Sequence, residues 1–256
     1  MREQPEQQAP PVQRLRIRYA KRGRLRFTSH RDFSRAFERA IFRARVPMAY
    51  SSGFNPHPRI SYANAAPTGS ASEAEYLEIA LAQEVDAAAL HGVLDEALPD
   101  GLDVVEVVES PGGSLADLLQ ASRWRIGTQV PLDEAREAVG AFLATPSVLV
   151  ERMTKKGVRE FDCRAAVVHL AVVGAEDSPG DDSGGAAGDA APAGGAELDL
   201  LLRHGVPSVR PDDVLTGLRR VASVETGDAP RLTRLAQGPF DEETATIGDP
   251  LATTRA

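Results

Sequence analysis

The sequence has very little cysteine. Cys163 is the only one in 256 residues, so the chain can form neither an internal disulfide nor a thiolate zinc site. A single thiol is also too few to hold an iron–sulfur cluster, which needs several cysteine ligands. No two histidines lie at the i, i+4 spacing of a helical metal pair; the five are His30, His57, His91, His169 and His204. We therefore expect the chain to bind no metal and to carry no cofactor.

Long apolar runs are also missing. The longest, such as 165–173 with His169 inside it, are far too short to cross a bilayer. The first residues, MREQPEQQAPP, are polar and lack the apolar core of a signal peptide. These features predict a cytoplasmic protein with no membrane contact.

The net charge of −8 conceals a strongly basic segment. Between Arg14 and Arg59 there are thirteen arginines and lysines but only two acidic residues, Asp32 and Glu38. This segment has eleven excess positive charges, so the rest of the chain must carry nineteen excess negative ones to reach −8. Such segregation predicts a surface for phosphates on an acidic body. The alternative is a solvated basic face that binds nothing.

The N-terminal half begins with a strand pattern followed by a helix pattern. Residues 1–12 are rich in Gln and Pro and are predicted to be disordered. From Arg14 onward basic and apolar residues alternate, which indicates a half-buried strand, and the alternation returns at 24–27. Ser29 then has the position of a helix N-cap, with Asp32 three residues later.

The predicted helix after Ser29 is a basic amphipath. Its apolar residues recur every three or four positions from Phe33 to Ala44, and Pro47 ends it. Arginines occupy the opposite side, namely Arg31, Arg35, Arg39 and Arg45, with Arg43 at the margin. Further strands are predicted at 59–63, 75–82 and 104–108, with a helix at 86–98.

The second half repeats this succession. Its predicted strands are 124–130, 148–153, 161–173, 197–202 and 231–236, and its helices are 132–144 and 211–221. Between two of these strands, 174–196 consists almost wholly of Gly, Ala, Asp, Ser and Pro, which predicts a disordered acidic insert.

The order strand, helix, strand, strand, helix, strand is that of a ferredoxin-like (split β-α-β) fold. We therefore predict an α+β protein with two ferredoxin-like domains in tandem and antiparallel sheets. The first, basic domain covers 13–110 and the second covers 122–236, joined by a linker at 111–121. Residues 237–256 are predicted to be a flexible tail.

Basic residues on the first strands are one candidate anion-binding set. If the apolar side packs under the helices, Arg14, Arg16, Arg18, Arg24 and Arg26 project from the open face of the sheet, with Lys21 at the turn between them. The alternative is a charged face that keeps the sheet soluble. Aromatic stacking platforms are not expected, since Tyr19 and Phe27 fall in the apolar set, so contacts to the nucleic-acid backbone are predicted. The nearby acidic residues Glu73, Glu75 and Glu78 are interpreted as solvated carboxylates, with ion pairs to the basic face as the alternative.

The helix start is a second candidate. His30 and Arg31 lie at its first turn, where free backbone N–H groups and the helix dipole favour an anion. The alternative interpretation makes Ser29 and Asp32 simple caps and His30 a local hydrogen-bonding residue.

The loop 53–59 is a third candidate. Two prolines stiffen it and leave Asn55 and His57 exposed, with Arg59 at its end, as in a recognition loop. A plain structural turn is equally consistent with the same residues.

Several short motifs of the N-terminal half occur together in this order. They are Lys21-x-Gly23, Phe27-x-Ser29-His30-x-Asp32, Arg39-Ala40, Pro47, Tyr50-Ser51-x-Gly53-Phe54-Asn55-Pro56-His57-Pro58 and Ser72-Glu73-x-Glu75-Tyr76. In this combination the chain resembles the radical SAM-linked proteins, a family built on a domain of unknown function. The resemblance covers about residues 14–110.

The resemblance implies an accessory protein for a separate radical SAM protein, of the cobalamin-binding type. Genes of that family lie near those for ribonuclease E/G and ribosomal proteins, which points to RNA or ribosome metabolism. The family carries no reaction and no catalytic residue that could be transferred to this chain.

The expected function is therefore that of a non-catalytic accessory protein that binds RNA or a ribonucleoprotein through its basic domain. One alternative is a metal-independent endoribonuclease, in which His30, Tyr50 and His57 supply acid–base chemistry. Another is a purely structural subunit of the radical SAM complex, which touches no nucleic acid.

Overall fold

The computed structural model describes residues 7–154, 157–174, 195–227 and 229–252. Helices and mainly antiparallel strands alternate along the chain, which confirms the α+β class. The chain divides into two compact units. Unit 1 comprises Met1–Leu118 with Asp249–Ala256, and unit 2 comprises Leu119–Gly248, so the division falls inside the segment predicted as a linker.

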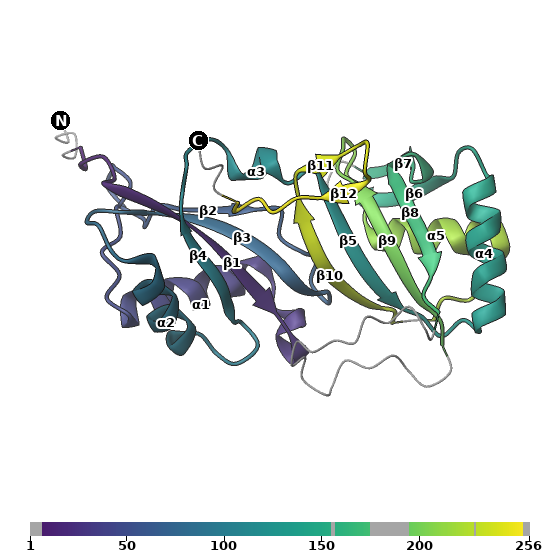
Figure 1. The fold of residues 1–256 in the computed structure, drawn as a ribbon, viewed down its shortest axis with the longest axis horizontal. Coiled ribbons are helices and arrows are strands. Elements are labelled where there is room, and N and C mark those ends of the chain that lie inside the picture. Colours follow the sequence, from purple (N-terminus) through teal and green to yellow (C-terminus); the bar gives the residue numbers. More distant parts are fainter. Residues whose placement is uncertain (1–6, 155–156, 175–194, 228, 253–256) are drawn as a thin grey trace. The chain divides into compact units, whose positions relative to one another are not determined.

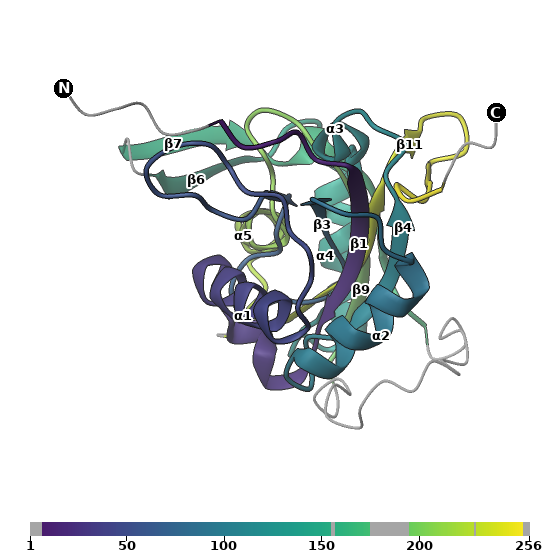
Figure 2. The same cartoon turned by 90° about the vertical axis from the view of Figure 1, so that its left-hand side faces the viewer.

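Unit 1 is one antiparallel sheet with two helices. Its main elements are β1 (Gln13–Lys21), α1 (His30–Arg43), β2 (Ile60–Ala63), β3 (Ala71–Leu81), α2 (Ala87–Ala97) and β4 (Val104–Glu109), with the 3₁₀ helix η1 (Gly23–Phe27) after β1 and the short α3 (Leu115–Leu118) after β4. Strand β1 lies between β4 and β3, and β2 pairs with β3. Both long helices cover the same face of this sheet (Figures 1 and 2).

Helix α1 forms where the sequence predicts it. The Ser29 hydroxyl accepts a hydrogen bond from the Asp32 N–H, which satisfies one of the free donors of the first turn. Phe33, Phe37 and Ile41 are buried against the apolar side of β1 and β3, together with side chains of α2. The helix therefore has one face in the core and one face in solvent.

Unit 2 repeats the order of the sheet strands and long helices of unit 1, with further short elements added. Its elements are β5 (Ala121–Gly127), α4 (Leu132–Ala144), β6 (Leu149–Thr154), β7 (Gly157–Asp162), η2 (Arg164–Ala166), β8 (Val167–Val172), β9 (Glu197–Arg203), α5 (Pro211–Ala222), β10 (Arg231–Gly238), β11 (Phe240–Asp241) and β12 (Thr246–Ile247). The sheet runs β10-β5-β9-β8, the counterpart of β4-β1-β3-β2 in unit 1, and β6 and β7 form a separate hairpin. The finer ferredoxin-like assignment stays a prediction.

Two predicted strands are wrong. Residues 24–27 lie in η1, because Gly23 has a φ of +52° and the chain turns there, with the Leu25 N–H donating to the Arg22 carbonyl. The predicted strand 161–173 is broken between β7 and β8. The Asp162 carboxylate accepts the N–H groups of Val148 and Arg164, which stabilises a turn at this point. These backbone hydrogen bonds also lower the pKa of Asp162, against the effect of its partial burial.

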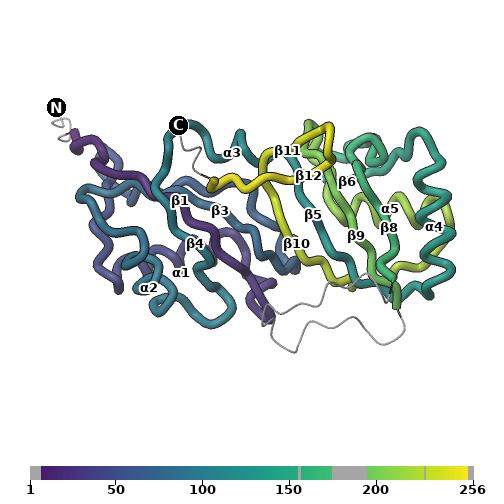
Figure 3. The backbone as a smooth tube through the Cα atoms, viewed as in Figure 1, coloured from purple at the N-terminus to yellow at the C-terminus, as the bar shows by residue number. Residues whose placement is uncertain are grey.

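The expected linker and tail also have regular structure. Within 111–121 lies α3, and β5 already begins at Ala121. The expected flexible tail continues β10 to Gly238 and then folds back as the hairpin β11–β12 (Figure 3). This hairpin is too short and polar to show an alternating pattern; the Asp241 carboxylate holds its turn by accepting the N–H groups of Glu243 and Thr244. Most of the predicted insert and residues 1–6 and 253–256 lie outside the described residues.

Two helical glycines of unit 2 provide a test of the packing between α4 and α5. A Cβ atom at Gly217 would lie 2.8 Å from Phe142 Cε2 and 2.9 Å from Cys163 Sγ, whereas a Cβ at Gly140 would meet nothing within 4 Å. We expect Gly217→Ala to lower the free energy of unfolding by about 1–3 kcal/mol through overpacking. Gly140→Ala should raise it by about 0.5–1 kcal/mol, because alanine is the better helix former. Urea unfolding measures both, and a stabilising Gly217→Ala would contradict this packing.

Candidate nucleic-acid interface

Arg16 is a buried residue, contrary to the expectation that it projects from an open sheet face. It lies directly opposite Glu78 in the pairing of β1 with β3, and its Nε donates to Glu78 Oε2 at 3.2 Å. Its Nη2 donates to the carbonyl oxygen of Gly112 at 2.6 Å, and the Ser110 hydroxyl donates to the same Glu78 oxygen at 2.7 Å. Only 1% of Arg16 is exposed. The residue thus joins β1 to β3 and to the segment after β4.

The other basic residues of β1 are also engaged within unit 1. Arg14 forms an ion pair with Glu78 at 3.1 Å, and Arg18 lies 3.8 Å from a Glu106 oxygen. Lys21 is buried beside the carbonyl groups of Ala66 and Pro67. The acidic residues of β3 and β4 therefore neutralise this sheet face, and the interpretation of Glu78 as a solvated carboxylate is wrong.

The arginine in the turn after β1 is also paired with acidic residues of unit 1. Arg22 forms ion pairs with Glu73 and with Asp103, and its hydrogen bonds to Glu73 raise the pKa of the guanidinium above its ordinary value. Glu73 is therefore an ion-pair partner too. Arg24 and Arg26 lie on η1, so neither stands on the sheet face; Arg24 is exposed, and the Arg26 guanidinium lies 4.9 Å from the centre of the Phe27 ring.

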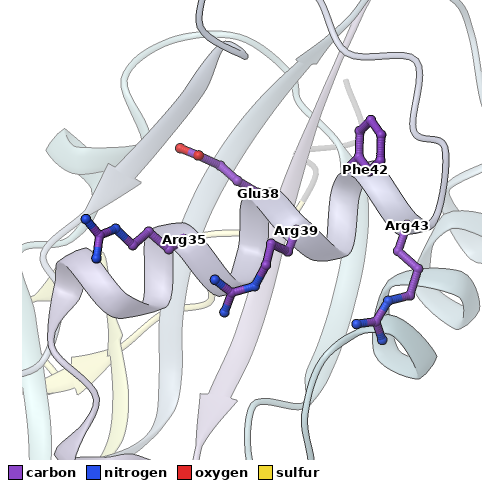
Figure 4. Close-up of a pocket in the computed structure, with 5 residues that line it drawn as sticks. All are labelled: Arg35, Glu38, Arg39, Phe42 and Arg43. Atoms are coloured by element: carbon purple, nitrogen blue, oxygen red, sulfur yellow. The ribbon is translucent and has the colours of Figure 1, made fainter.

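The outer face of α1 is different, because its arginines are exposed. We call Arg31, Arg35, Arg39 and Arg43 the arginine stripe; they follow each other at intervals of four residues and so lie on one side of the helix. Arg35, Arg39 and Arg43 project from the same side in Figure 4. Across the described residues Arg31, Arg35 and Arg39 form no hydrogen bond or ion pair, and Arg43 donates only to the carbonyl of Ala97.

Phe42 is a site residue that the sequence analysis missed. It is 86% exposed and, with Glu38, stands beside the arginine stripe along a shallow, open depression on α1 (Figure 4). Leaving such a ring in water forgoes about 1.5–3 kcal/mol that its burial would contribute. The helical periodicity could have predicted the exposure of Phe42, since at about 100° per residue it lies about 180° from the buried Phe33.

The start of α1 is an ordinary capped terminus next to an aromatic cluster. The Ser29 hydroxyl also donates to the Asp32 carboxylate at 2.6 Å, so a negative charge already occupies this end of the helix. The exposed His30 packs its ring against Tyr62, with the ring centres 4.8 Å apart and the planes nearly perpendicular. Burial, together with the charge of Glu38, raises the pKa of the Tyr62 hydroxyl above its ordinary value.

The loop 53–59 is closed by its own backbone. The Ser51 N–H donates to the His57 carbonyl, and the His57 N–H donates to the Ser51 hydroxyl at 3.0 Å. The Arg59 side chain donates to the Tyr50 carbonyl, whereas Asn55 and His57 are exposed. Over the described ranges no hydrogen bond or ring contact connects His30, Tyr50 and His57 to one another.

Cys163 belongs to the core of unit 2. It is fully buried, and burial raises the pKa of its thiol to about 12, so it stays protonated at neutral pH. Within the part of the chain that the structure describes, no group of three or more His, Cys, Asp or Glu side chains is arranged to hold a metal ion. Nor does any helix among these residues have the length and apolar character needed to span a membrane.

Fold and site together define an α+β protein of two units, in which one helix of the first unit displays arginines that have no ion pair among the described residues. The chain belongs to the bacterial family described as "Uncharacterized protein conserved in bacteria (DUF2344)", whose model matches residues 14–211. The match includes the whole of α1 and extends into unit 2. No curated protein matches the sequence.

Arg16 and Arg14 both contact Glu78, so replacing each in turn compares the stability contributed by a buried arginine with that of an exposed one. We expect Arg16→Leu to lower the free energy of unfolding by about 1–3 kcal/mol, because Glu78, whose side chain is only 10% exposed, loses its buried donor and the Gly112 carbonyl loses its partner as well. Arg14→Leu is the matched control: the Arg14 side chain is 48% exposed, and its loss should cost about 1 kcal/mol or less. Chemical denaturation measures both variants. Equal effects would show that Arg16 does not have the structural role assigned to it.

Proposed function

We propose that this protein is a non-catalytic accessory protein that binds RNA or a ribonucleoprotein through the arginine stripe of α1. The observation that carries the proposal is the contrast between two sets of arginines. Those of β1 are engaged by carboxylates or carbonyl groups, whereas Arg31, Arg35 and Arg39 are exposed and have no partner among the described residues. Unpaired guanidinium groups in water are available to phosphate oxygens without first breaking an ion pair.

The spacing of the arginine stripe suits a chain of phosphates. Residues four apart on a helix are separated by about 6 Å along its axis, so neighbouring guanidinium groups can each contact a different phosphate. A guanidinium also presents its N–H groups in a planar fork that binds two oxygens at once. Because the outer face of α1 is solvent-exposed, a phosphodiester chain can lie along it without rearrangement of the core.

The radical SAM partner is the second part of the proposal, and it rests on the sequence resemblance alone. The motifs between Lys21 and Tyr76 suggest a partner of the cobalamin-binding type. A chain with one cysteine cannot ligate an iron–sulfur cluster by itself, so the proposal assigns the radical chemistry to that partner. In this scheme the present chain holds the RNA in the cytoplasm and the partner modifies it.

Binding is preferred to RNA cleavage as the proposed activity. An endoribonuclease needs an acid and a base that reach the same phosphodiester group. The candidate residues His30, Tyr50 and His57 make no contact with one another within the described structure. His30 instead packs against Tyr62, and the His57 backbone closes its own loop. The arginine stripe requires no such assembly in order to bind phosphate.

Replacing two arginines of the stripe tests the binding surface. We expect Arg35→Ala/Arg39→Ala to weaken binding of a labelled hairpin RNA with a single-stranded tail. A plot of log K against log salt concentration has a negative slope, and we expect its magnitude to decrease by about 1.4. Each lost contact to a single strand removes about 0.7 from that magnitude. Fluorescence anisotropy at several salt concentrations measures both quantities.

The matched control for that variant is Arg136→Ala on α4. Arg136 is also an exposed helical arginine, but it pairs with Asp133 at 3.1 Å. Its replacement should leave RNA affinity and salt slope unchanged. An equal loss in both variants would indicate non-specific attraction. No RNA binding by the unaltered protein would overturn the proposal and leave the structural-subunit alternative.

Glu38 allows a test in the opposite direction. Its carboxylate lies on the same depression as Arg35 and Arg39 and repels a phosphate there. We expect Glu38→Gln to tighten RNA binding by roughly two- to five-fold, because a charge a few ångströms away in water is worth about 1 kcal/mol. The same anisotropy titration measures this gain. Unchanged affinity would indicate that the RNA does not lie on this face of α1.

A further inference from the structure

Phe42 occupies an unusual place for an aromatic residue. The other phenylalanines of α1, Phe33 and Phe37, belong to the core of unit 1. Phe42 instead stands on the solvent side, 86% exposed, three residues after Arg39 and four after Glu38. Figure 4 shows its ring directed away from the helix on the same edge as Glu38, whereas Arg39 and Arg43 extend toward the other edge; all of them line one depression. The sequence therefore places an apolar ring within the most basic face of the unit.

Exposed aromatic residues are also unevenly distributed. Four large aromatic side chains of the described residues are exposed, and all four lie in the basic segment between Arg14 and Arg59. They are Phe27, Phe42, Tyr50 and Phe54. The exposed large apolar residues of unit 2 are all aliphatic. This corrects the expectation that the basic domain offers no aromatic platform, although only Phe42 lines the same depression as arginines of the stripe.

The combination of a ring and unpaired arginines distinguishes between forms of RNA. A duplex presents phosphates and sugars at its surface, while the faces of its bases are stacked inside. An exposed ring can stack only on a base that is not paired, whereas arginines contact the phosphates of either form. Resting on the RNA binding proposed above, we infer that the stripe takes unpaired RNA, with the ring of Phe42 stacked on a base and the flanking guanidinium groups on its phosphates.

A protein partner fits the same surface less well. Protein interfaces centre on a cluster of buried apolar side chains with charged residues at the rim. Here a single ring lines the depression together with Arg35, Arg39 and Arg43, and Glu38 is the one acidic residue among its lining residues. Burying three guanidinium groups against protein would require three matched acceptors, whereas a phosphodiester chain supplies an anion at every nucleotide.

The experiment compares two RNA ligands of the full-length protein. One is a labelled single-stranded oligouridylate of about 12 nucleotides, within the usual site size for single-strand binders. The other is a mixed-sequence RNA duplex of the same length. We expect Phe42→Ala to weaken binding of the single strand by about five-fold or more, as loss of one base–aromatic stack does, and to change duplex binding less than two-fold. Phe42→Trp, which keeps a stacking surface, should retain single-strand affinity.

The outcomes separate this inference from the proposed function. If Arg35→Ala/Arg39→Ala weakens binding but Phe42→Ala does not, RNA binding stands and the stacking inference is overturned. Equal losses for the single strand and the duplex also overturn it. If neither RNA binds the unaltered protein, both proposals fail. Because Phe42 is exposed, its replacement should leave the unfolding midpoint unchanged, and this is checked on the same samples.

Discussion

A charged guanidinium inside a protein is stable only if its charge and its N–H groups find partners there. In unit 1 this constraint falls on Arg16, whose partners are Glu78 on the neighbouring strand and the carbonyl groups of Gly112 and Gly113. The arrangement fixes the register of β1 against β3 and holds the segment after β4. It also means that much of the basic charge near the N-terminus serves the fold, whereas the arginine stripe of α1 stays exposed.

In the proposed scheme, stability and RNA binding are assigned to opposite faces of one helix. Phe33, Phe37 and Ile41 hold α1 against the sheet, and their periodicity alone suffices to place the helix. The outer face does not hold α1 against the sheet, since Arg31, Arg35 and Arg39 contact no described side chain through a hydrogen bond or ion pair. Residues on this face can therefore be selected for what they bind. Phe42 is consistent with that freedom, because its exposure contributes nothing to the core.

The sequence predicted elements that are governed by local rules and failed where distant residues decide. Helix α4 was predicted at its observed bounds, and Ser29 was recognised as the cap of α1, because periodicity and capping act within a few positions. Alternation correctly placed Arg16 and Leu15 on different faces of the strand. The burial of Arg16, however, depends on Glu78, 62 residues later, and on the antiparallel register. Phe42 was not considered as a site residue, because only its basic neighbours were assigned to the outer face, although its position on the helical wheel placed it among them.

The acidic remainder of the chain has a role in this scheme as well. Charges in physiological salt are screened beyond about 8 Å, so the electrostatic interaction with an RNA depends mainly on the protein surface nearest to it. Outside the segment 14–59 the chain has nineteen excess negative charges, which would repel a phosphate chain. The arginine stripe would attract it, because Glu38 is the one carboxylate among the residues that line its depression. In the proposed scheme, the charge segregation thus favours an orientation in which the RNA lies against α1 and reaches Phe42.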